Sequence, residues 1–234
     1  MLTLIEAIVL YKIKYGENDL ICYTYSKAHG YICFILKNAF SKKAKSKSVH
    51  FLPLSHVEII SYLKKSSLSI IRESKIIYPY KSLYSQKEKI QMVFFLSEFL
   101  NKVLKEEPPN NELFSFITYS LTLLDNKESN FADFHLFFIL NLSKYLGFPP
   151  SIEEENLEFF CLKDGQFKRH YFDFCLDKKE SLLFKKLIFL NFEDSINQFN
   201  YIQRQELIAI LLRYFSFHLK EIKEMKSLMV LKNL

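Results

Sequence analysis

Apolar and polar positions in the first 80 residues follow the two-residue alternation and the short apolar runs that are typical of β-strands. Val, Ile, Tyr and Phe, which pack well on a pleated surface, are frequent in these runs. Polar connections separate them, and Gly16 and Gly30 are suited to turns because glycine tolerates positive φ. The pattern predicts five strands, over residues 2–11, 20–25, 31–39, 51–62 and 68–78.

Five short strands within about 80 residues, with few glycines and no helical stretch of useful length, indicate a small closed barrel. The OB-fold is the commonest barrel of this size that binds single-stranded nucleic acid. We therefore expect an OB-fold in the first third of the chain.

Beyond residue 85 the apolar period changes to 3.6 residues, which is typical of amphipathic helices. Helices are expected over residues 86–104, from 110 or 111 to about 124, 130–146, 181–190 and, as one long helix or two abutting ones, 203–231. Residues 157–175 interrupt this period and predict a hairpin that turns at Asp164-Gly165. The expected fold class is α+β, with an OB-fold barrel at 1–80 and a helical domain with a small β-hairpin insertion at 81–234.

Charge is distributed unevenly between these two parts. Residues 1–80 hold twelve basic and five acidic side chains, a net of +7, whereas the remaining 154 residues hold twenty basic and twenty-one acidic ones. A basic module joined to a nearly neutral one suggests that the first module meets a polyanion.

The strongest candidate for that contact is the polar loop that follows the third predicted strand. Between Gly30 and Ser48 the sequence has no acidic residue, and its five lysines are Lys37, Lys42, Lys43, Lys45 and Lys47. A solvated surface loop is the alternative, but the +7 charge of the barrel favours phosphate contact by these lysines. Further candidates are Lys12, Lys14 and Arg72. Tyr15, Tyr31 and Phe40 are candidates for base stacking, although aromatic residues of a small barrel are more often part of its core.

No constellation of catalytic residues is evident. The sequence lacks a P-loop and the GxGxxG, HExxH and GxSxG motifs, so we expect a protein that is not an enzyme. Its four cysteines form no CxxC pair, which fits a reducing compartment. No apolar run of 18 residues is free of charges, and the N-terminus lacks a basic region, so neither a membrane span nor a signal peptide is expected. These features predict a cytoplasmic protein.

Five short segments, in order along nearly the whole chain, resemble one bacterial family. They are Lys12 with Tyr15-Gly16-Glu17-x-Asp19-x-Ile21, His29-Gly30 with Leu36-Lys37-Asn38-Ala39, Leu52-Pro53-Leu54, Phe137–Pro149, and Leu219 with Lys226-Ser227-Leu228. On these segments the chain resembles RecO, a family of recombination mediators in DNA repair. The resemblance implies binding and annealing of single-stranded DNA and leaves binding to double-stranded DNA open. It also implies RecR and the C-terminal tail of the single-strand binding protein as partners in loading RecA, in association with the nucleoid.

Two departures from the family pattern concern predicted sites. The arginine pair of the family's KGARR segment is missing, and nearby lysines would supply point charges in place of a bidentate fork. Many members carry a four-cysteine zinc site, whereas here the region holds only Cys161 and Cys175, with His170 between them. Structural zinc needs four ligands, so we expect no metal and no cofactor.

Two other functions are compatible with the residues alone. The barrel could bind an acidic protein surface, which would make the chain an interaction scaffold, or it could bind RNA. A steep salt dependence of oligonucleotide binding would separate DNA binding from the scaffold function, and competition between DNA and RNA would separate the two nucleic acids.

Overall fold

The computed structural model describes residues 2–41, 48–64, 68–152, 157–190, 197–219, 222 and 225–231. The chain forms two compact units, Met1–Asn126 and Lys127–Leu234. Among the described residues, no helix combines the length and the apolar character that a membrane span requires.

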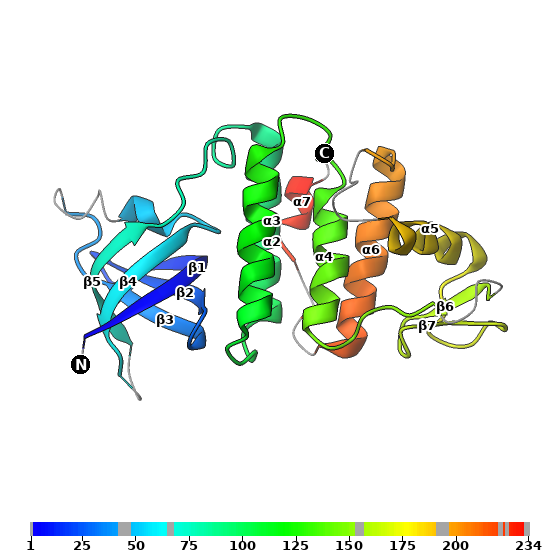
Figure 1. Ribbon diagram of the computed structural model, residues 1–234, viewed down its shortest axis with the longest axis horizontal. Helices are drawn as coiled ribbons and strands as arrows, with labels where there is room; N and C mark the ends of the chain where they lie inside the picture. Colours follow the sequence, from blue (N-terminus) through cyan, green and yellow to red (C-terminus); the bar gives the residue numbers. More distant parts are fainter. Residues whose placement is uncertain are drawn as a thin grey trace. The chain divides into compact units, whose positions relative to one another are not determined.

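The first unit begins with the predicted closed barrel of five strands (Figure 1). Its strands are β1 (Leu2–Tyr15), β2 (Asp19–Ser26), β3 (Gly30–Leu36), β4 (His56–Tyr62) and β5 (Ser69–Ile76). They follow the order β1-β2-β3-β5-β4, and antiparallel pairing of β1 with β4 joins the two ends. The only parallel pairing in the barrel joins β3 to β5, where Phe34 lies opposite Ser69 and Ile35 opposite Ile70. This architecture confirms the predicted OB-fold.

Alternation along the strands fills the barrel with apolar side chains. The core includes Ile5, Ala7, Val9, Leu20, Cys22, Phe34, Leu36, Val57, Ile59 and Ile71. The alternation of β1 changes at a bulge, because Val9 pairs with Thr24 and Tyr11 pairs with Tyr23, which leaves Leu10 as an extra residue. After the bulge, the inward-facing and outward-facing positions of β1 are therefore exchanged.

The predicted strand at 51–62 begins later than expected. Val49–Phe51 form a 3-10 helix, η1, and the strand starts at His56. Pro53 has no N–H to donate, and Leu54 has a φ of 63°. The Leu54 N–H donates to the Val9 carbonyl, 2.7 Å away, so this turn pairs with the bulged part of β1 and does not extend the strand.

Two helices complete the first unit, α2 (Lys87–Val103) and α3 (Asn111–Asn126). The Ser97 hydroxyl on α2 donates to the Leu10 carbonyl in the bulge. The Tyr25 hydroxyl of β2 donates to the Pro108 carbonyl at 2.9 Å, in the connection between the helices. Gly30 lies against the same connection, where an added Cβ would come within 2.8 Å of the Glu107 carbonyl oxygen. The predicted domain boundary lies near residue 80; these contacts join the barrel to α2 and to the connection before α3, within the unit Met1–Asn126.

A buried carboxylate connects the end of α3 to the segment that leads out of the barrel. Asp125 accepts hydrogen bonds from the backbone N–H groups of Lys81, Ser82 and Leu83, at 2.7–3.0 Å. The Lys89 ammonium is also buried and donates to the Ser82 hydroxyl and the Asp125 carbonyl. Burial acts to raise the pKa of Asp125, but these N–H donors outweigh it and hold the pKa below its usual range.

The second unit consists of helices and a two-stranded sheet. Its elements are α4 (Phe134–Tyr145), β6 (Phe159–Cys161), β7 (Gln166–Lys168), α5 (Lys178–Phe189), α6 (Tyr201–His218) and α7 (Leu228–Leu231). The hairpin turns as predicted, with Gly165 at a φ of 70°. The expected helix over 203–231 is wrong in its length, because α6 ends at His218 and Leu219 is extended.

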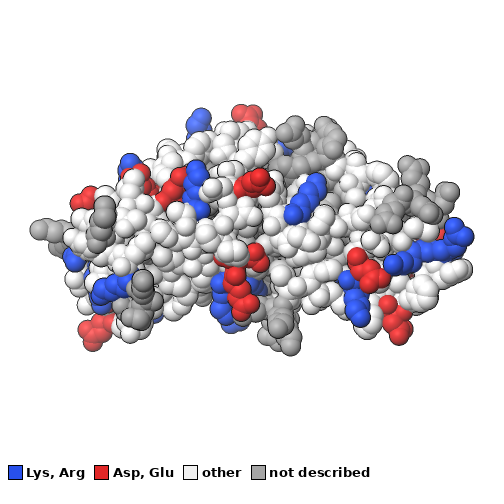
Figure 2. Space-filling view, turned by 60° about the horizontal axis from the view of Figure 1, so that its bottom comes forward, with Lys and Arg blue, Asp and Glu red and all other residues white. Residues whose placement is uncertain are grey.

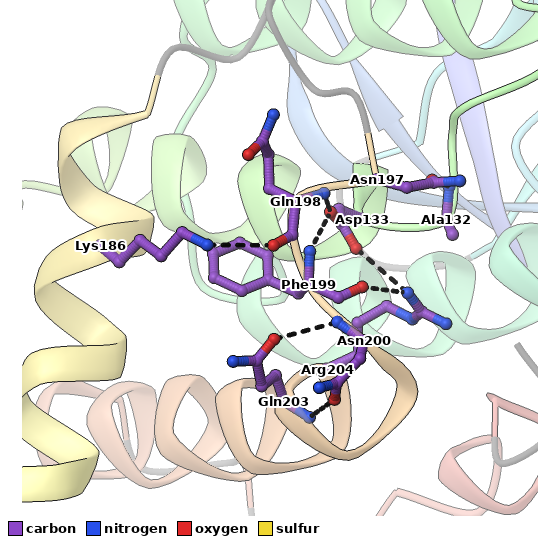
Figure 3. Close-up of polar contacts among 9 residues, drawn as sticks. All are labelled: Ala132, Asp133, Lys186, Asn197, Gln198, Phe199, Asn200, Gln203 and Arg204. Atoms are coloured by element: carbon purple, nitrogen blue, oxygen red, sulfur yellow. Dashed lines mark hydrogen bonds and ion pairs between the residues drawn. The ribbon is translucent and has the colours of Figure 1, made fainter.

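Asp133 organises the start of α6 (Figure 3). Its Oδ2 accepts from the N–H groups of Gln198 at 2.5 Å and Phe199 at 3.1 Å, and its Oδ1 lies 3.5 Å from the Arg204 guanidinium. Burial raises the pKa of Asp133, although these donors act in the opposite direction. The carboxylate also immediately precedes α4, which starts at Phe134 and not at the predicted residue 130, where Asn130 has a φ of 58°.

Replacing Asp125 with Ala should destabilise the first unit by about 2–4 kcal/mol at pH 7, because three backbone donors would lose a charged acceptor. The pKa of Asp125 is lower in the folded state than in the unfolded state. The carboxylate therefore stabilises the fold at pH values above the unfolded-state pKa, and this contribution is lost as the pH falls through the folded-state pKa. Urea unfolding should therefore separate wild type from Asp125→Ala at pH 7 and separate them less at pH 3. Glu112→Gln, on the exposed start of α3, is the matched control; an equal loss in both variants would contradict this role for Asp125.

Candidate nucleic-acid interface

The predicted lysine loop starts at the end of β3, and its first lysine is held in place. The Lys37 ammonium lies 2.7 Å from Asp19 Oδ2, and the Asn38 N–H donates to Asp19 Oδ1 at 2.9 Å. These two donors lower the pKa of Asp19. Lys37 therefore joins the root of the loop to the start of β2, and its side chain stays half exposed. Lys42, Lys43, Lys45 and Lys47 lie outside the described residues.

Lys12 and Lys14 follow the bulge on β1. Lys12 pairs with Cys22 and Lys14 with Leu20, so both lie on the side of the strand that faces the barrel core. Burial lowers the pKa of Lys12. Lys14 is exposed and places its ammonium 5.7 Å from the centre of the Phe40 ring. This contact brings Lys14 to Phe40, at the root of the lysine loop.

The last candidate, Arg72, lies on β5. Its guanidinium lies 5.7 Å from the centre of the Tyr62 ring on the neighbouring strand β4. The contacts among described residues thus gather Lys14, Lys37 and Phe40 around the end of β3, and they attach Arg72 to another strand pair. On the face shown in Figure 2, basic and acidic side chains are interspersed, and they form no single-sign patch among the residues described there. The binding role of all these residues stays a prediction.

A groove between α5 and α6 is a second candidate site that the sequence analysis missed. Its volume is about 610 Å³, and its lining includes Leu182, Phe189 and Ile202 together with Lys179, Lys185 and Lys186. The apolar side chains are 72%, 57% and 66% exposed, respectively. Lys186 donates to the Gln198 carbonyl at 3.1 Å and so holds α5 to the segment before α6 (Figure 3). The groove combines exposed apolar side chains with neighbouring ammonium groups, which suits a peptide that carries both apolar and anionic groups.

A signal for this groove is present in the sequence. Ser181, Phe184 and Leu187 form the buried face of α5, yet Leu182 and Phe189 lie on the remaining face at a spacing of seven residues. A helix that is apolar on two faces has more apolar surface than its own core uses. Exposed contiguous apolar side chains are typical of interaction sites.

Comparison with known proteins identifies both parts of the chain. Residues 1–80 match the family described as "Recombination protein O N terminal", and residues 86–228 match "Recombination protein O C terminal". The chain belongs to the RecO family. It is 36% identical over 231 residues to "DNA repair protein RecO" of Flavobacterium johnsoniae, covering 98% of this chain and 97% of that protein. Proteins of the same name from Flavobacterium psychrophilum and Bacteroides fragilis are 38% and 31% identical, over 97% and 100% of this chain and 96% and 99% of theirs.

The region of the hairpin holds a pair of thiols. Cys161, at the end of β6, lies opposite Cys175 in an isolated antiparallel bridge, and both are buried. Burial raises the pKa of the Cys175 thiol, and the neighbouring Cys161 adds to this shift. His170 is exposed, and the described residues contain no cluster of three side chains able to hold a metal ion. The pair offers two of the four ligands that a structural zinc site needs.

We predict that the purified protein carries far less than one zinc per chain, because two thiols do not make a four-ligand site. Elemental analysis after dialysis against zinc measures this directly. About one zinc per chain that is lost in Cys161→Ser and kept in Cys33→Ser would show that a zinc site exists.

Proposed function

We propose that this chain is a recombination mediator in DNA repair, which binds and anneals single-stranded DNA and catalyses no covalent reaction. The observation that carries the proposal is the match of 1–80 and 86–228 to the two parts of the RecO family. The closed barrel supports it, because small OB-fold barrels bind single strands along the sugar-phosphate backbone. In this role the protein works on chromosomal DNA in the cytoplasm.

The charge of the first 80 residues supports DNA backbone contact. A net charge of +7 there attracts phosphates, and each lysine that meets a phosphate releases a condensed counterion. Neutralising phosphates on two complementary strands removes much of their repulsion, so the strands can meet and pair. Annealing therefore needs a basic surface and no catalytic residue. Lys14 and Lys37, at the root of the loop, would extend the surface that Lys42, Lys43, Lys45 and Lys47 provide.

The proposed mediator acts with partners. RecR and the single-strand binding protein are the partners in this proposal, and RecA is loaded as the result. Single-strand binding protein covers the DNA, so a mediator must hold that protein as well as the strand. The groove between α5 and α6 supports protein docking, because its exposed apolar residues lie beside three lysines.

We assign this groove to the C-terminal tail of the single-strand binding protein. A C-terminal tail ends in a free carboxylate, which complements the ammonium groups of Lys179, Lys185 and Lys186. Lys179 lies 2.8 Å from Glu206 and is 79% exposed, so it can turn from that carboxylate to another. Apolar side chains next to the carboxylate would cover Leu182, Phe189 and Ile202.

Replacing Lys42, Lys43, Lys45 and Lys47 with Ala should weaken binding to single-stranded DNA and reduce the salt dependence of binding. Each lost phosphate contact lowers the slope of log affinity against log salt by about 0.7, so four contacts would remove roughly 2.8 and two roughly 1.4. Fluorescence anisotropy at several salt concentrations measures the slope. The loss should be similar for all base sequences, because phosphates carry no sequence information.

The matched control replaces four exposed lysines of the second unit, Lys144, Lys163, Lys178 and Lys226. An unchanged slope in the loop variant, or an equal change in the control, would contradict the assignment of DNA contact to the loop. Thermal unfolding of both variants excludes a folding defect as the cause.

For the groove, Ile202→Glu and Lys179→Ala should each weaken binding of a peptide with the sequence of that tail by about tenfold or more. The first change places a carboxylate on the apolar floor, and the second removes a cation. An amidated peptide should bind wild type more weakly than the free acid. Phe172→Glu, a change at a residue that is 59% exposed elsewhere in the same unit, is the control. Equal binding of amide and acid would contradict the assignment.

A further inference from the structure

Three tyrosines from three adjacent strands form a row on the barrel. The ring centres of Tyr11 on β1 and Tyr23 on β2 are 6.1 Å apart, and those of Tyr23 and Tyr31 on β3 are 6.2 Å apart. Successive rings are tilted by 35° and 39°. We call these three side chains the tyrosine row.

The row lies on the outer face of the sheet. Cys22 and Phe34 point into the core, so Tyr23 and Cys33, which pair with each other, point outward. The bulge at Leu10 brings Tyr11 opposite Tyr23 on that outer face. Tyr11 is 48% exposed, and Tyr23 and Tyr31 are partly exposed. These rings therefore contribute little to the barrel core.

Helix α2 bonds to the Tyr31 side chain and to the backbone beside Tyr11. The Tyr31 hydroxyl donates to Asn101 Oδ1 at 2.9 Å, and the Ser97 hydroxyl donates to the carbonyl of Leu10, the bulge residue next to Tyr11. A ring that is already held in place, as Tyr31 is, loses little conformational entropy when a ligand stacks on it.

Charge around the row does not oppose a polyanion. The outward residues of the described strands β2 and β3, and of β1 after the bulge, include one carboxylate, Asp19. The Lys37 ammonium neutralises it at 2.7 Å. Cross-strand pairs would by themselves justify one aromatic contact in a sheet. A row of three rings across three strands exceeds that need, and the outer face of β2 and β3 is where OB-folds hold oligonucleotides.

We propose that Tyr11, Tyr23 and Tyr31 form a stacking platform for the bases of single-stranded DNA. The inference rests on the proposed function and deepens it, because it assigns base contact to the row and leaves phosphate contact to the lysines. Stacking is tolerant of sequence, since every base has a π-face.

Tyr23→Leu in the full chain should weaken binding to an oligo(dT) strand by roughly 5- to 100-fold, since the variant keeps an apolar side chain and loses the ring. The salt slope should not change, because a neutral ring releases no counterion. An abasic strand of the same length should bind wild type and Tyr23→Leu equally. Tyr171→Leu, which removes a 61% exposed tyrosine of the second unit, is the matched control.

Tyr11→Trp gives a second test that does not depend on removing a ring. The sequence contains no tryptophan, so this residue would be the sole indole reporter. Saturation with oligo(dT) should quench its fluorescence, whereas the abasic strand should leave it unchanged.

Normal, salt-dependent binding of oligo(dT) by Tyr23→Leu, with no quenching in Tyr11→Trp, would overturn the platform and leave the proposed function intact. Loss of RecR binding in Tyr23→Leu with normal DNA binding would show that the row is a protein interface, which also overturns the platform. Failure of wild type to bind single-stranded DNA at low salt would overturn both proposals.

Discussion

A short parallel pairing between β3 and β5 closes the barrel, and the arrangement of the first unit depends on this closure. Two residue pairs, Phe34 with Ser69 and Ile35 with Ile70, join strands that are separated in sequence by the lysine loop, η1 and β4. Closure divides every strand into an inner and an outer face. It also places the root of the loop at the end of a strand that is fixed on both sides, by β2 and by β5.

The bulge in β1 is the second constraint. One extra residue, Leu10, exchanges the inner and outer faces of the strand, so Lys12 and Lys14 follow the inward side while Tyr11 faces outward. Ser97 on α2 bonds the bulge, and Tyr31 and Tyr25 bond α2 and the connection after it. The helices α2 and α3 are therefore part of the structure that shapes the barrel surface. Asp125 completes this unit by binding the three N–H groups that follow the barrel.

The candidate surfaces differ in their physical chemistry. Lysine contacts with phosphate depend steeply on salt and do not read the bases, whereas stacking on tyrosine rings depends little on salt and requires bases. The groove of the second unit combines apolar area with ammonium groups, which suits a peptide end better than a nucleic acid strand. In the proposed function the chain holds DNA and a DNA-binding protein at the same time, which requires surfaces that do not compete for one ligand chemistry.

The sequence alone determined the class of fold and the family. Two-residue alternation and then a period of 3.6 are local properties of the chain, so the barrel, the helices and the hairpin at Gly165 could be predicted. The net charge of residues 1–80 could be counted from the sequence, and it identified the lysine loop as a candidate for phosphate contact. Asn110 caps α3, because its side chain accepts hydrogen bonds from the N–H groups of Glu112 and Leu113. This contact spans only three residues, so it is a local property of the sequence.

Only the tertiary structure decided the features that depend on residues distant in sequence. The bulge at Leu10 leaves no local signal, because it shows only when β1 is aligned with β2 and Ser97 is present to bond it. The union of the barrel with α2 and the connection after it rests on bonds across 70 to 87 residues. Lys37 reads as a free charge in the sequence, but folding brings it 2.7 Å from Asp19. Pairing across such distances is set by the packing of whole elements, which a local pattern does not encode.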